Sequence, residues 1–296
     1  MSAWEGVVSS IITPLKNRGN AIDAEAMRKY CDFIIEKGVH GIFALGTTGE
    51  GPLLSLSERR TVAETVVAHV NKRIPVIIHT GSITTKQTIE LTGHCRDIGA
   101  DAAGMVLPYY YRLDDQSIFT HFQRIADAVP DFPFFIYNIP QSTVNNLSPA
   151  LFEKLINTIG TIAGVKTSNP DIFQIMDYIS IAKERCTVFV GCDHLILPAL
   201  FAGARGIVSG NCSALPEPFL DLYLAFKKQE FERAREHQAF CHKVENILVQ
   251  GPSIALFKRT LEFRGVKAGN VREPNRELTL GETDNLRKSL KELELV

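Results

Sequence analysis

A lysine ends one of the short apolar segments of this 296-residue chain. The segment Thr161–Lys166 reads T-I-A-G-V-K, and Lys166 is its only charged residue. Burial disfavours the charged form of a lysine, and the neutral amine is a nucleophile that attacks ketone carbonyls to form a Schiff base. A lysine in this position also fits a structural ion pair. The position alone therefore leaves a catalytic and a structural interpretation open.

Other residues with hydrogen-bonding side chains also follow apolar segments. Tyr137 ends the segment Pro133–Tyr137, where its phenol fits either a proton relay to Lys166 or a single buried hydrogen bond. Gly46-Thr47-Thr48-Gly49 offers hydroxyls and backbone N–H groups that suit a small carboxylate, although such residues are common in loops. The run Tyr109-Tyr110-Tyr111 fits aromatic packing, a substrate wall or a subunit contact.

A further segment end, Gly191-Cys192-Asp193, is expected to contribute Gly191 and Asp193 as substrate contacts. Asp193 and His194 are not expected to form a base, because adjacent residues on a turn usually point apart. The eight histidines form no H-x-x-x-H pair, so we predict no metal site. The chain also lacks the G-x-S-x-G motif of serine hydrolases and the G-x-x-x-x-G-K-[ST] motif of nucleotide-binding loops.

The elements that carry these residues alternate regularly. Short segments that are apolar at nearly every position are typical of parallel strands buried on both faces, and longer amphipathic segments between them are typical of helices. The expected strands are Val7–Ile12, Gly41–Leu45, Pro75–His79, Ala102–Leu107, Pro133–Tyr137, Thr161–Lys166, Thr187–Val190 and Gly206–Ser209. The expected helices between them include Ala24–Lys37, Ser57–Val70, Thr85–Ile98, Asp115–Ala128 and Pro149–Ile156.

The spacing of these segments favours a closed (β/α)8 barrel, or TIM barrel. Strand starts recur roughly every 20–35 residues, as in a chain of βα units. Gly38, Gly99 and Gly203 each lie between a helix end and the next strand, where glycine adopts the left-handed conformation at little cost. An open doubly wound sheet is less favoured, because no G-x-G-x-x-G follows the first strand.

The chain beyond the eighth strand is purely helical. The expected helices there are Glu217–Lys228, Glu230–Leu248, Ser253–Phe263 and Glu282–Leu293. Because the barrel needs only the first of them to close, we expect residues 1–228 to form the catalytic barrel. Residues 229–296 are expected to form a C-terminal helical extension packed on its side.

The composition excludes several classes of partner. A net charge of -1 and the absence of a basic run argue against nucleic acid. No apolar run approaches the ~18 residues of a membrane span, and no signal peptide is recognisable, so we predict a cytoplasmic protein without a membrane partner. The six cysteines form no C-x-x-C pair and are expected to be buried free thiols.

Four of these motifs together resemble those of one enzyme family, the pyruvate-dependent class I aldolases of dihydrodipicolinate synthase and N-acetylneuraminate lyase. The motifs are Gly46-Thr47-Thr48-Gly49-Glu50, Pro108-Tyr109-Tyr110, Tyr137-Asn138-Ile139-Pro140 and Gly164-Val165-Lys166. Their order and spacing match the family from about Gly6 to the C-terminal helices. The resemblance implies a TIM barrel that needs no cofactor, because the lysine itself serves as the electron sink. It also implies a homotetramer built as a dimer of dimers.

The resemblance further implies a role for each matching residue. Lys166 matches the Schiff-base lysine, and Tyr137 matches the tyrosine that shuttles protons. Thr47 and Thr48 match the pair that binds the keto-acid carboxylate and links the proton relay. Tyr110 matches a tyrosine that, in the synthases, reaches into the neighbouring subunit's site.

Two more positions follow from the same match. Val208 matches an apolar position whose backbone lies near bound pyruvate, and Gly46 belongs to the carboxylate-binding turn. Ser142 departs from the synthase pattern, because the synthases carry there an arginine that meets the second substrate's carboxylate. A hydroxyl cannot replace the bidentate grip of a guanidinium, although Arg112 is an alternative anchor. We therefore expect Ser142 to face a hydroxyl-rich aldehyde.

The predicted reaction joins pyruvate reversibly to an aldehyde, and the run of three tyrosines looks more like the 2-keto-3-deoxygluconate aldolases than the synthases. The leading prediction is therefore a 2-keto-3-deoxy sugar acid aldolase. One alternative is dihydrodipicolinate (4-hydroxy-tetrahydrodipicolinate) synthase, which condenses pyruvate with aspartate semialdehyde. Others are a 2-keto-3-deoxy acid dehydratase, a metabolite-binding barrel without catalysis, and a phosphate-handling barrel. The last is disfavoured because Ser209-Gly210-Asn211-Cys212 lacks a glycine-rich phosphate cradle.

Overall fold

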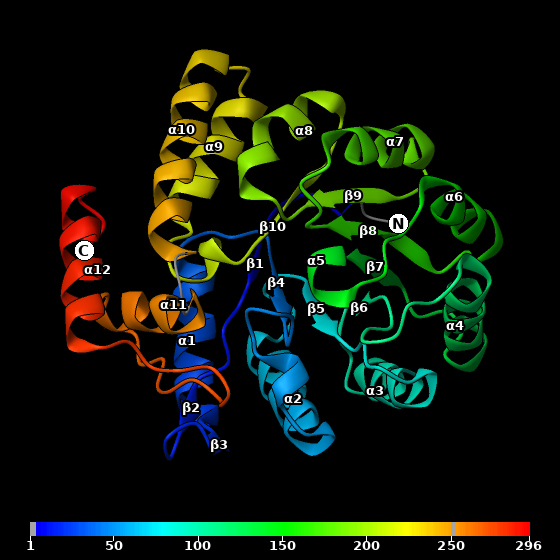
Figure 1. The fold of residues 1–296 in the computed structure, drawn as a ribbon, viewed down its shortest axis with the longest axis horizontal. Coiled ribbons are helices and arrows are strands. Elements are labelled where there is room, and N and C mark those ends of the chain that lie inside the picture. The colour runs from blue at the N-terminus through cyan, green and yellow to red at the C-terminus, as the bar shows by residue number, and fades with distance from the viewer. Residues whose placement is uncertain (1–3, 250–252) are drawn as a thin grey trace.

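Eight parallel strands close into a barrel at the centre of the computed structural model, which describes residues 4–249 and 253–296 (Figure 1). Because the first strand pairs with both its neighbours, the barrel has no free edge. The predicted TIM barrel and all eight predicted strands are confirmed. In order around the barrel the strands are β1 (Gly6–Ser10), β10 (Gly206–Ser209), β9 (Thr187–Val190), β8 (Ile162–Thr167), β7 (Phe134–Asn138), β6 (Ala102–Val106), β5 (Val76–His79) and β4 (Gly41–Ala44).

Side chains alternate between the inside of the barrel and the surrounding helices. Along β7, Phe135 and Tyr137 belong to an inner cluster of buried residues, whereas Phe134 and Ile136 belong to the larger outer cluster. This is the two-residue period of a strand, so each strand fills both layers of the core. The inner cluster comprises Val8, Phe43, Ile77, Ala102, Val106, Phe135, Tyr137, Ile139, Ala163, Phe189 and Val208.

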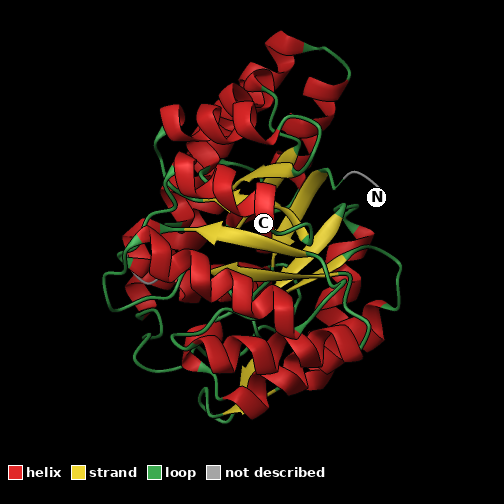
Figure 2. Ribbon diagram, turned by 90° about the vertical axis from the view of Figure 1, so that its right-hand side faces the viewer, coloured by secondary structure: helices red, strands yellow, loops and turns green. Residues whose placement is uncertain are grey.

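Helices surround the strands, as Figures 1 and 2 show from two directions. Many helices begin at a capping side chain, and Thr84, Asp114 and Ser148 each accept a hydrogen bond from the first turn. Gly38 and Gly99 adopt φ angles of 85° and 80° directly after helices, as predicted. The barrel helices are α1 (Ala24–Glu36), α2 (Leu56–Val70), α3 (Thr85–Asp97), α4 (Asp115–Ala128), α6 (Pro149–Thr158), α7 (Ile172–Ala182), α8 (Ile196–Ala202) and α9 (Glu217–Lys227).

Three further helices follow α9 and confirm a C-terminal helical extension. They are α10 (Phe231–Leu248), α11 (Ser253–Phe263) and α12 (Leu280–Glu292). Helix α10 packs along α9, and α11 and α12 lie to one side of the barrel (Figure 1). The last helix begins two residues before the predicted Glu282, because Thr279 and Glu282 form a reciprocal cap. The boundary between residues 228 and 229 stays a prediction.

Some elements were not delimited by the sequence pattern. The antiparallel pair β2 (Leu15–Lys16) and β3 (Ala21–Ile22) has two residues per strand, too few for a period to be read. Helix α5 (Pro140–Thr143) forms a single turn directly after β7. Helices α7 and α8 follow the sixth and seventh strands of the barrel, β8 and β9. Their sequences are apolar at so many positions that they lack a clear amphipathic stripe.

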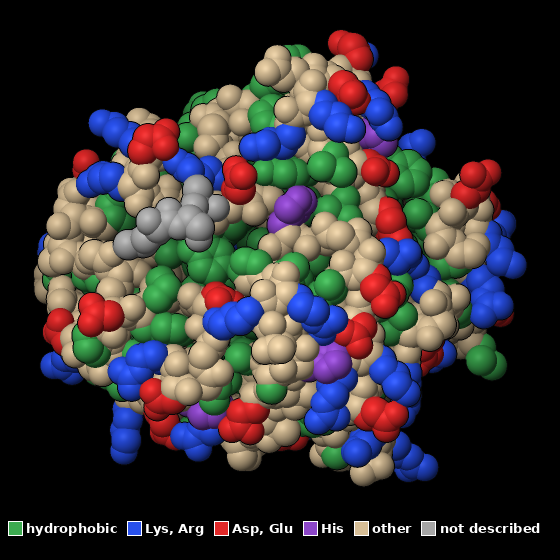
Figure 3. Space-filling model, turned by 180° about the vertical axis from the view of Figure 1, so that it is seen from behind, with side chains coloured by type: hydrophobic (Ala, Val, Ile, Leu, Met, Phe, Trp, Pro, Cys, Tyr) green, Lys and Arg blue, Asp and Glu red, His purple; other side chains and the backbone are tan. Residues whose placement is uncertain are grey.

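The described residues also bear on the predicted partners. No helix within residues 4–249 and 253–296 is long and apolar enough to cross a membrane. The same ranges contain no group of three or more His, Cys, Asp or Glu side chains arranged to hold a metal ion. Acidic and basic side chains are interspersed over the face shown in Figure 3. All six cysteines are free thiols, and five of them are buried, which agrees with the prediction.

Candidate functional site

A β-bulge in β8 directs Lys166 into the barrel. The pairing register between β7 and β8 shifts by one residue after Phe134, where Ala163 is the extra residue. Beyond the bulge, Lys166 pairs with Tyr137, which belongs to the inner cluster. Without the extra residue, Val165 would stand opposite Tyr137 and Lys166 would face the helices, because side chains alternate along a strand. The bulge therefore decides an orientation that the sequence left open.

The Lys166 side chain is buried between aromatic rings. The residue is 4% exposed, and Nζ lies 4.0 Å from the centre of the Tyr137 ring and 4.6 Å from that of Phe43. Ring faces attract a cation and, by packing, restrict where the amine can lie. No ion pair to Lys166 is found among the described residues, so the structural ion-pair interpretation receives no support there.

Gly191, one of the predicted site residues, lies next to Lys166 and to the carbonyl of Val208. A Cβ at Gly191 would lie 3.1 Å from Lys166 Cε and 3.1 Å from the Val208 carbonyl oxygen. Glycine therefore leaves the space that the lysine side chain occupies. The Val208 side chain belongs to the inner cluster, and its carbonyl oxygen lies on the same side of Gly191 as Lys166 Cε.

The hydroxyl of Tyr137 has a partner that the sequence analysis missed. It lies 3.4 Å from Ser168 Oγ, two residues beyond Lys166. A serine hydroxyl both donates and accepts hydrogen bonds, so this pair is able to pass a proton. Among the described residues no hydrogen bond joins Thr47 or Thr48 to Tyr137. The predicted relay through these threonines is therefore not made by a direct contact within the chain.

The glycine–threonine turn after β4 reaches the same mouth. A Cβ at Gly46 would lie 2.8 Å from the ring of Phe43, which also contacts Lys166. Thr48 is buried, and a Cβ at Gly210 would lie 2.9 Å from its hydroxyl oxygen, so the turn also abuts the loop after β10. Thr47 is exposed on the open side of the turn.

Asp193 is a buried carboxylate directly after β9. Its Oδ2 accepts hydrogen bonds from Ser209 Oγ at 2.6 Å and Asn211 Nδ2 at 2.8 Å. Burial raises the pKa of Asp193, while these two hydrogen bonds and the charge of Lys166 act in the opposite direction. Its Oδ1 has no hydrogen-bond partner among the described residues. A buried acceptor without a partner near the lysine is compatible with the predicted substrate contact.

The loop after β6 presents its tyrosines at different depths. Tyr109 packs against the inner cluster, whereas Tyr110 and Tyr111 are 77% and 66% exposed, with ring centres 5.0 Å apart. Tyr110 has a φ of 80°, which is unusual for a bulky residue. Asn145 holds this loop by donating to the Pro108 and Tyr111 carbonyls at 2.7 and 2.8 Å. Tyr110 thus faces solvent rather than the inside of its own barrel.

Helix α5 places Ser142 in solvent near the end of β8. The adjacent Gln141 donates through Nε2 to the carbonyl of Ser168 at 2.8 Å, which ties α5 to that strand end. Ser142 itself is exposed, and so is the alternative anchor, Arg112. The position that carries arginine in the synthases therefore presents a hydroxyl here.

A buried basic pair, also missed by the sequence analysis, flanks Tyr137. The His79 ring meets the Tyr137 ring edge-on, with centres 6.3 Å apart. Burial and the nearby Arg59 hold the pKa of His79 well below its usual range, which favours the neutral imidazole. Arg59 donates to the carbonyls of His79 and Gly81 at 2.9 and 3.1 Å, and burial lowers the pKa of Arg59 to about 10. In the sequence, only the position of His79 at the end of an expected strand indicated that it lies at the site.

The closed barrel and the buried lysine at its mouth define the architectural class, a TIM barrel with an enclosed lysine amine. The model of the dihydrodipicolinate synthetase family matches residues 3–293. The chain belongs to this family and is a lyase of the class I, Schiff-base aldolase type. The resemblance stated from the motifs is confirmed.

Individual relatives cover nearly the whole chain. An uncharacterized DapA-like lyase from Halobacterium salinarum is 36% identical over 291 residues, 98% of this chain and 94% of the relative. A 4-hydroxy-tetrahydrodipicolinate synthase from Methanopyrus kandleri is 34% identical over 292 residues, 99% of this chain and 97% of the relative. YagE, a prophage protein of the dihydrodipicolinic acid synthase family from E. coli K12, was solved in complex with pyruvate. It has a TM-score of 0.95 over 100% of both chains, at 26% identity.

Proposed function

We propose that Lys166 forms a Schiff base with pyruvate and that the enzyme reversibly joins this pyruvate to a hydroxyl-rich aldehyde, as a 2-keto-3-deoxy sugar acid aldolase. The observation that carries the proposal is the enclosed Lys166 amine, held by the rings of Tyr137 and Phe43 at the barrel mouth. The solved relative YagE, which contains pyruvate, supports the choice of keto acid.

In the proposed mechanism the keto-acid carboxylate binds the Thr47–Thr48 turn, and the Lys166 amine attacks C2. The Tyr137 phenol gives a proton to the carbinolamine hydroxyl, which leaves as water and yields an iminium. The Tyr137 phenolate then takes the proton of the C4 hydroxyl as the C3–C4 bond breaks, and the iminium accepts the electron pair of that bond, so the aldehyde departs and an enamine remains. Protonation at C3 and hydrolysis then release pyruvate and restore the amine. Lys166 itself provides the electron sink, so these steps use no cofactor.

The proposed aldehyde follows from the polar groups around the mouth. Ser142, Ser168 and the free oxygen of Asp193 offer hydroxyl and carboxylate partners, which suit a polyhydroxylated chain. A second candidate is condensation with aspartate semialdehyde, favoured by the synthase name of the Methanopyrus kandleri relative. That reaction would need another anchor for the second carboxylate, and Arg112 is the candidate for it.

We further propose that the enzyme assembles as a homotetramer, a dimer of dimers. The exposed apolar side chains include two separate groups, the loop with Tyr110 and Tyr111 and helix α7 with Phe173 and Met176. Contiguous exposed apolar side chains mark association sites, and a dimer of dimers requires two different self-complementary surfaces.

The test is pyruvate release from a panel of 2-keto-3-deoxy sugar acids and N-acetylneuraminate, followed by coupled reduction of the pyruvate. Release from a sugar acid that is lost in Lys166→Ala supports the proposal. Activity on none of the panel, together with condensation of pyruvate and aspartate semialdehyde, would establish the synthase instead. Borohydride reduction with pyruvate should attach the keto acid at Lys166 in either case, and no adduct would refute the Schiff base.

A further inference from the structure

A buried ion pair joins the C-terminal extension to the glycine–threonine turn. Lys258, from α11, donates to Glu50 Oε2 at 2.6 Å, and the two side chains are 3% and 1% exposed. The other oxygen of Glu50 accepts from the Arg272 backbone N–H at 2.7 Å and from Asn275 Nδ2 at 3.0 Å. The ammonium of Lys258 also donates to the carbonyl of Asn270 at 2.5 Å. Glu50 thus accepts three hydrogen bonds and Lys258 donates two, and several of the partners lie far apart in the chain.

Glu50, the acidic residue of this ion pair, directly follows the glycine–threonine turn. In the proposed function that turn binds the carboxylate of the keto acid. Glu50 has a φ of 55°, a left-handed conformation that needs support from its surroundings. Its backbone N–H donates to the Thr47 carbonyl at 3.1 Å, and the next N–H, of Gly51, donates to the Gly46 carbonyl at 3.1 Å. Displacement of Glu50 therefore moves Gly46 and Thr47 directly.

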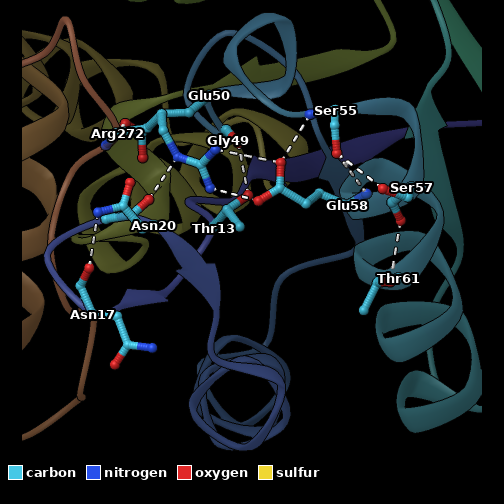
Figure 4. Close-up of polar contacts among 11 residues, drawn as sticks. Thr13, Asn17, Asn20, Gly49, Glu50, Ser55, Ser57, Glu58, Thr61 and Arg272 are labelled. Atoms are coloured by element: carbon cyan, nitrogen blue, oxygen red, sulfur yellow. Dashed lines mark hydrogen bonds and ion pairs between the residues drawn. The ribbon is translucent and has the colours of Figure 1, made fainter.

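The extension makes a second contact beside the first. The Arg272 guanidinium binds both carboxylate oxygens of Glu58, in the first turn of α2, at 2.6 and 3.3 Å. Figure 4 shows this pair next to Glu50, with the Thr13 hydroxyl donating to the Gly49 carbonyl, a bond of 2.7 Å. The turn is thus held by Thr13, which follows β1, and by the extension, which is itself paired with α2.

A buried ion pair stabilises little by itself, because desolvation opposes the attraction, but it fixes geometry when every donor and acceptor is matched. We propose that Lys258 and Asn275 are positioning residues for the Thr47–Thr48 turn, so that the C-terminal extension sets the affinity for the keto-acid carboxylate. This inference rests on the proposed function, in which that turn binds pyruvate.

The experiment measures the pyruvate concentration that gives half-maximal borohydride-trapped adduct at Lys166, by mass spectrometry of the full-length chain. In Lys258→Met this concentration should rise roughly ten- to hundredfold, as expected when a binding group shifts by about 1 Å. The adduct yield at saturating pyruvate should stay complete, because Lys166 is untouched. Asn275→Ala removes one hydrogen bond from a half-buried side chain and should give a smaller rise, about two- to fivefold.

Because an unpaired Glu50 endangers folding, the double variant Glu50→Gln/Lys258→Met removes both charges. It should fold and still show the raised half-saturation. Lys267→Met is the matched control. Lys267 also belongs to the C-terminal extension, and its 2.7 Å ion pair with Asp23 does not involve the glycine–threonine turn. Its half-saturation should equal that of the wild type.

The outcomes separate the two claims. Folded Asn275→Ala and double variants with wild-type half-saturation would overturn the positioning role and leave the Schiff base standing, even if their melting temperatures fell. A wild-type chain that forms no adduct at any pyruvate concentration would overturn the proposed function, and the positioning role with it.

Discussion

The position of the Lys166 side chain depends on the absence of a side chain at Gly191. The inner cluster fills the barrel below the lysine, and the rings of Phe43 and Tyr137 hold the amine. Gly191 is a further neighbour, and because it has no side chain it leaves room for Lys166 Cε and for Ser168 Oγ. Protein interiors do not absorb an added methyl group without a shift of their neighbours.

Gly191→Ala should therefore slow Schiff-base formation while leaving the barrel intact. The new Cβ would lie 3.1 Å from Lys166 Cε and 2.5 Å from Ser168 Oγ, so the amine and its neighbour must move. We expect the rate of adduct trapping with pyruvate to fall roughly ten- to hundredfold, with a small change in melting temperature. Gly160→Ala is the matched control, because nothing lies within 4 Å of a Cβ there. An unchanged trapping rate in Gly191→Ala would contradict the packing argument.

The elements that carry the site are held by polar contacts between loops. Asn145 is buried, donates to the Pro108 and Tyr111 carbonyls, and accepts from the Leu113 N–H at 2.9 Å. Its side chain therefore links the loop after α5 to the loop that carries the tyrosines. No repeat or spacing in the sequence marks this asparagine.

Asn145→Ala should lower the free energy of unfolding by about 2–4 kcal/mol, because one buried and two partly buried hydrogen bonds to the backbone are lost. Urea denaturation measures the loss. Asn146→Ala is the comparison, since Asn146 is exposed and accepts one hydrogen bond, from Asn138. If both variants lose the same free energy of unfolding, the additional hydrogen bonds of Asn145 do not stabilise the protein.

Glu58, in the first turn of α2, should make the stability of the protein depend on pH. The Arg272 guanidinium, with the Ser55 backbone, holds the pKa of Glu58 below its ordinary value of 4.5, so folding favours the ionised carboxylate. A lowered folded-state pKa stabilises the protein above about pH 4.5, and this contribution disappears as the pH falls through the folded-state pKa.

Glu58→Gln should accordingly cost about 1–2 kcal/mol at pH 7, measured by urea denaturation. The gap to the wild type should narrow steadily below about pH 4.5, where the wild-type carboxylate takes up its proton. Glu90→Gln, which breaks the exposed pair with Arg60, should change the stability little at either pH. A gap that stays constant from pH 7 to pH 3 would rule out the charge as its cause.

The strands and most of the helices could be predicted from the sequence, but the contacts between them could not. Continuous apolar segments and helix-ending glycines gave the eight strands, because both are local consequences of burial and chain reversal. Lys166 was found at a strand end, but its direction depends on the bulge at Ala163, which appears only when β7 and β8 are paired. Ser168 and Lys258 were missed for the same reason, since their partners are distant in the sequence.

At the scale of the whole molecule, the exposed apolar residues are unevenly placed. Phe173 is 78% exposed and Met176 lies three residues later on the same face of α7, while Tyr110 and Tyr111 protrude from the loop after β6. Phe201 and Phe231 are also exposed, but their rings pack on each other at 5.1 Å within one chain. The α7 and tyrosine groups are therefore the candidates for contacts between subunits.

Each of these two groups should form a different interface of the proposed tetramer. A substitution in either group should therefore break one interface and leave the other intact. A charge buried at a self-complementary contact meets its own copy across the two-fold axis, which doubles the cost. We expect Phe173→Glu and Tyr111→Glu each to yield dimers by light scattering, and the double variant to yield monomers. Leu280→Glu, at an exposed apolar residue of α12, should leave the tetramer unchanged. Because the family resemblance implies that Tyr110 reaches into a neighbouring subunit's site, the Phe173→Glu dimer should keep its aldolase activity and the Tyr111→Glu dimer should lose it. A wild-type monomer with full activity would instead mean that Lys166, Tyr137 and Ser168 of one chain suffice.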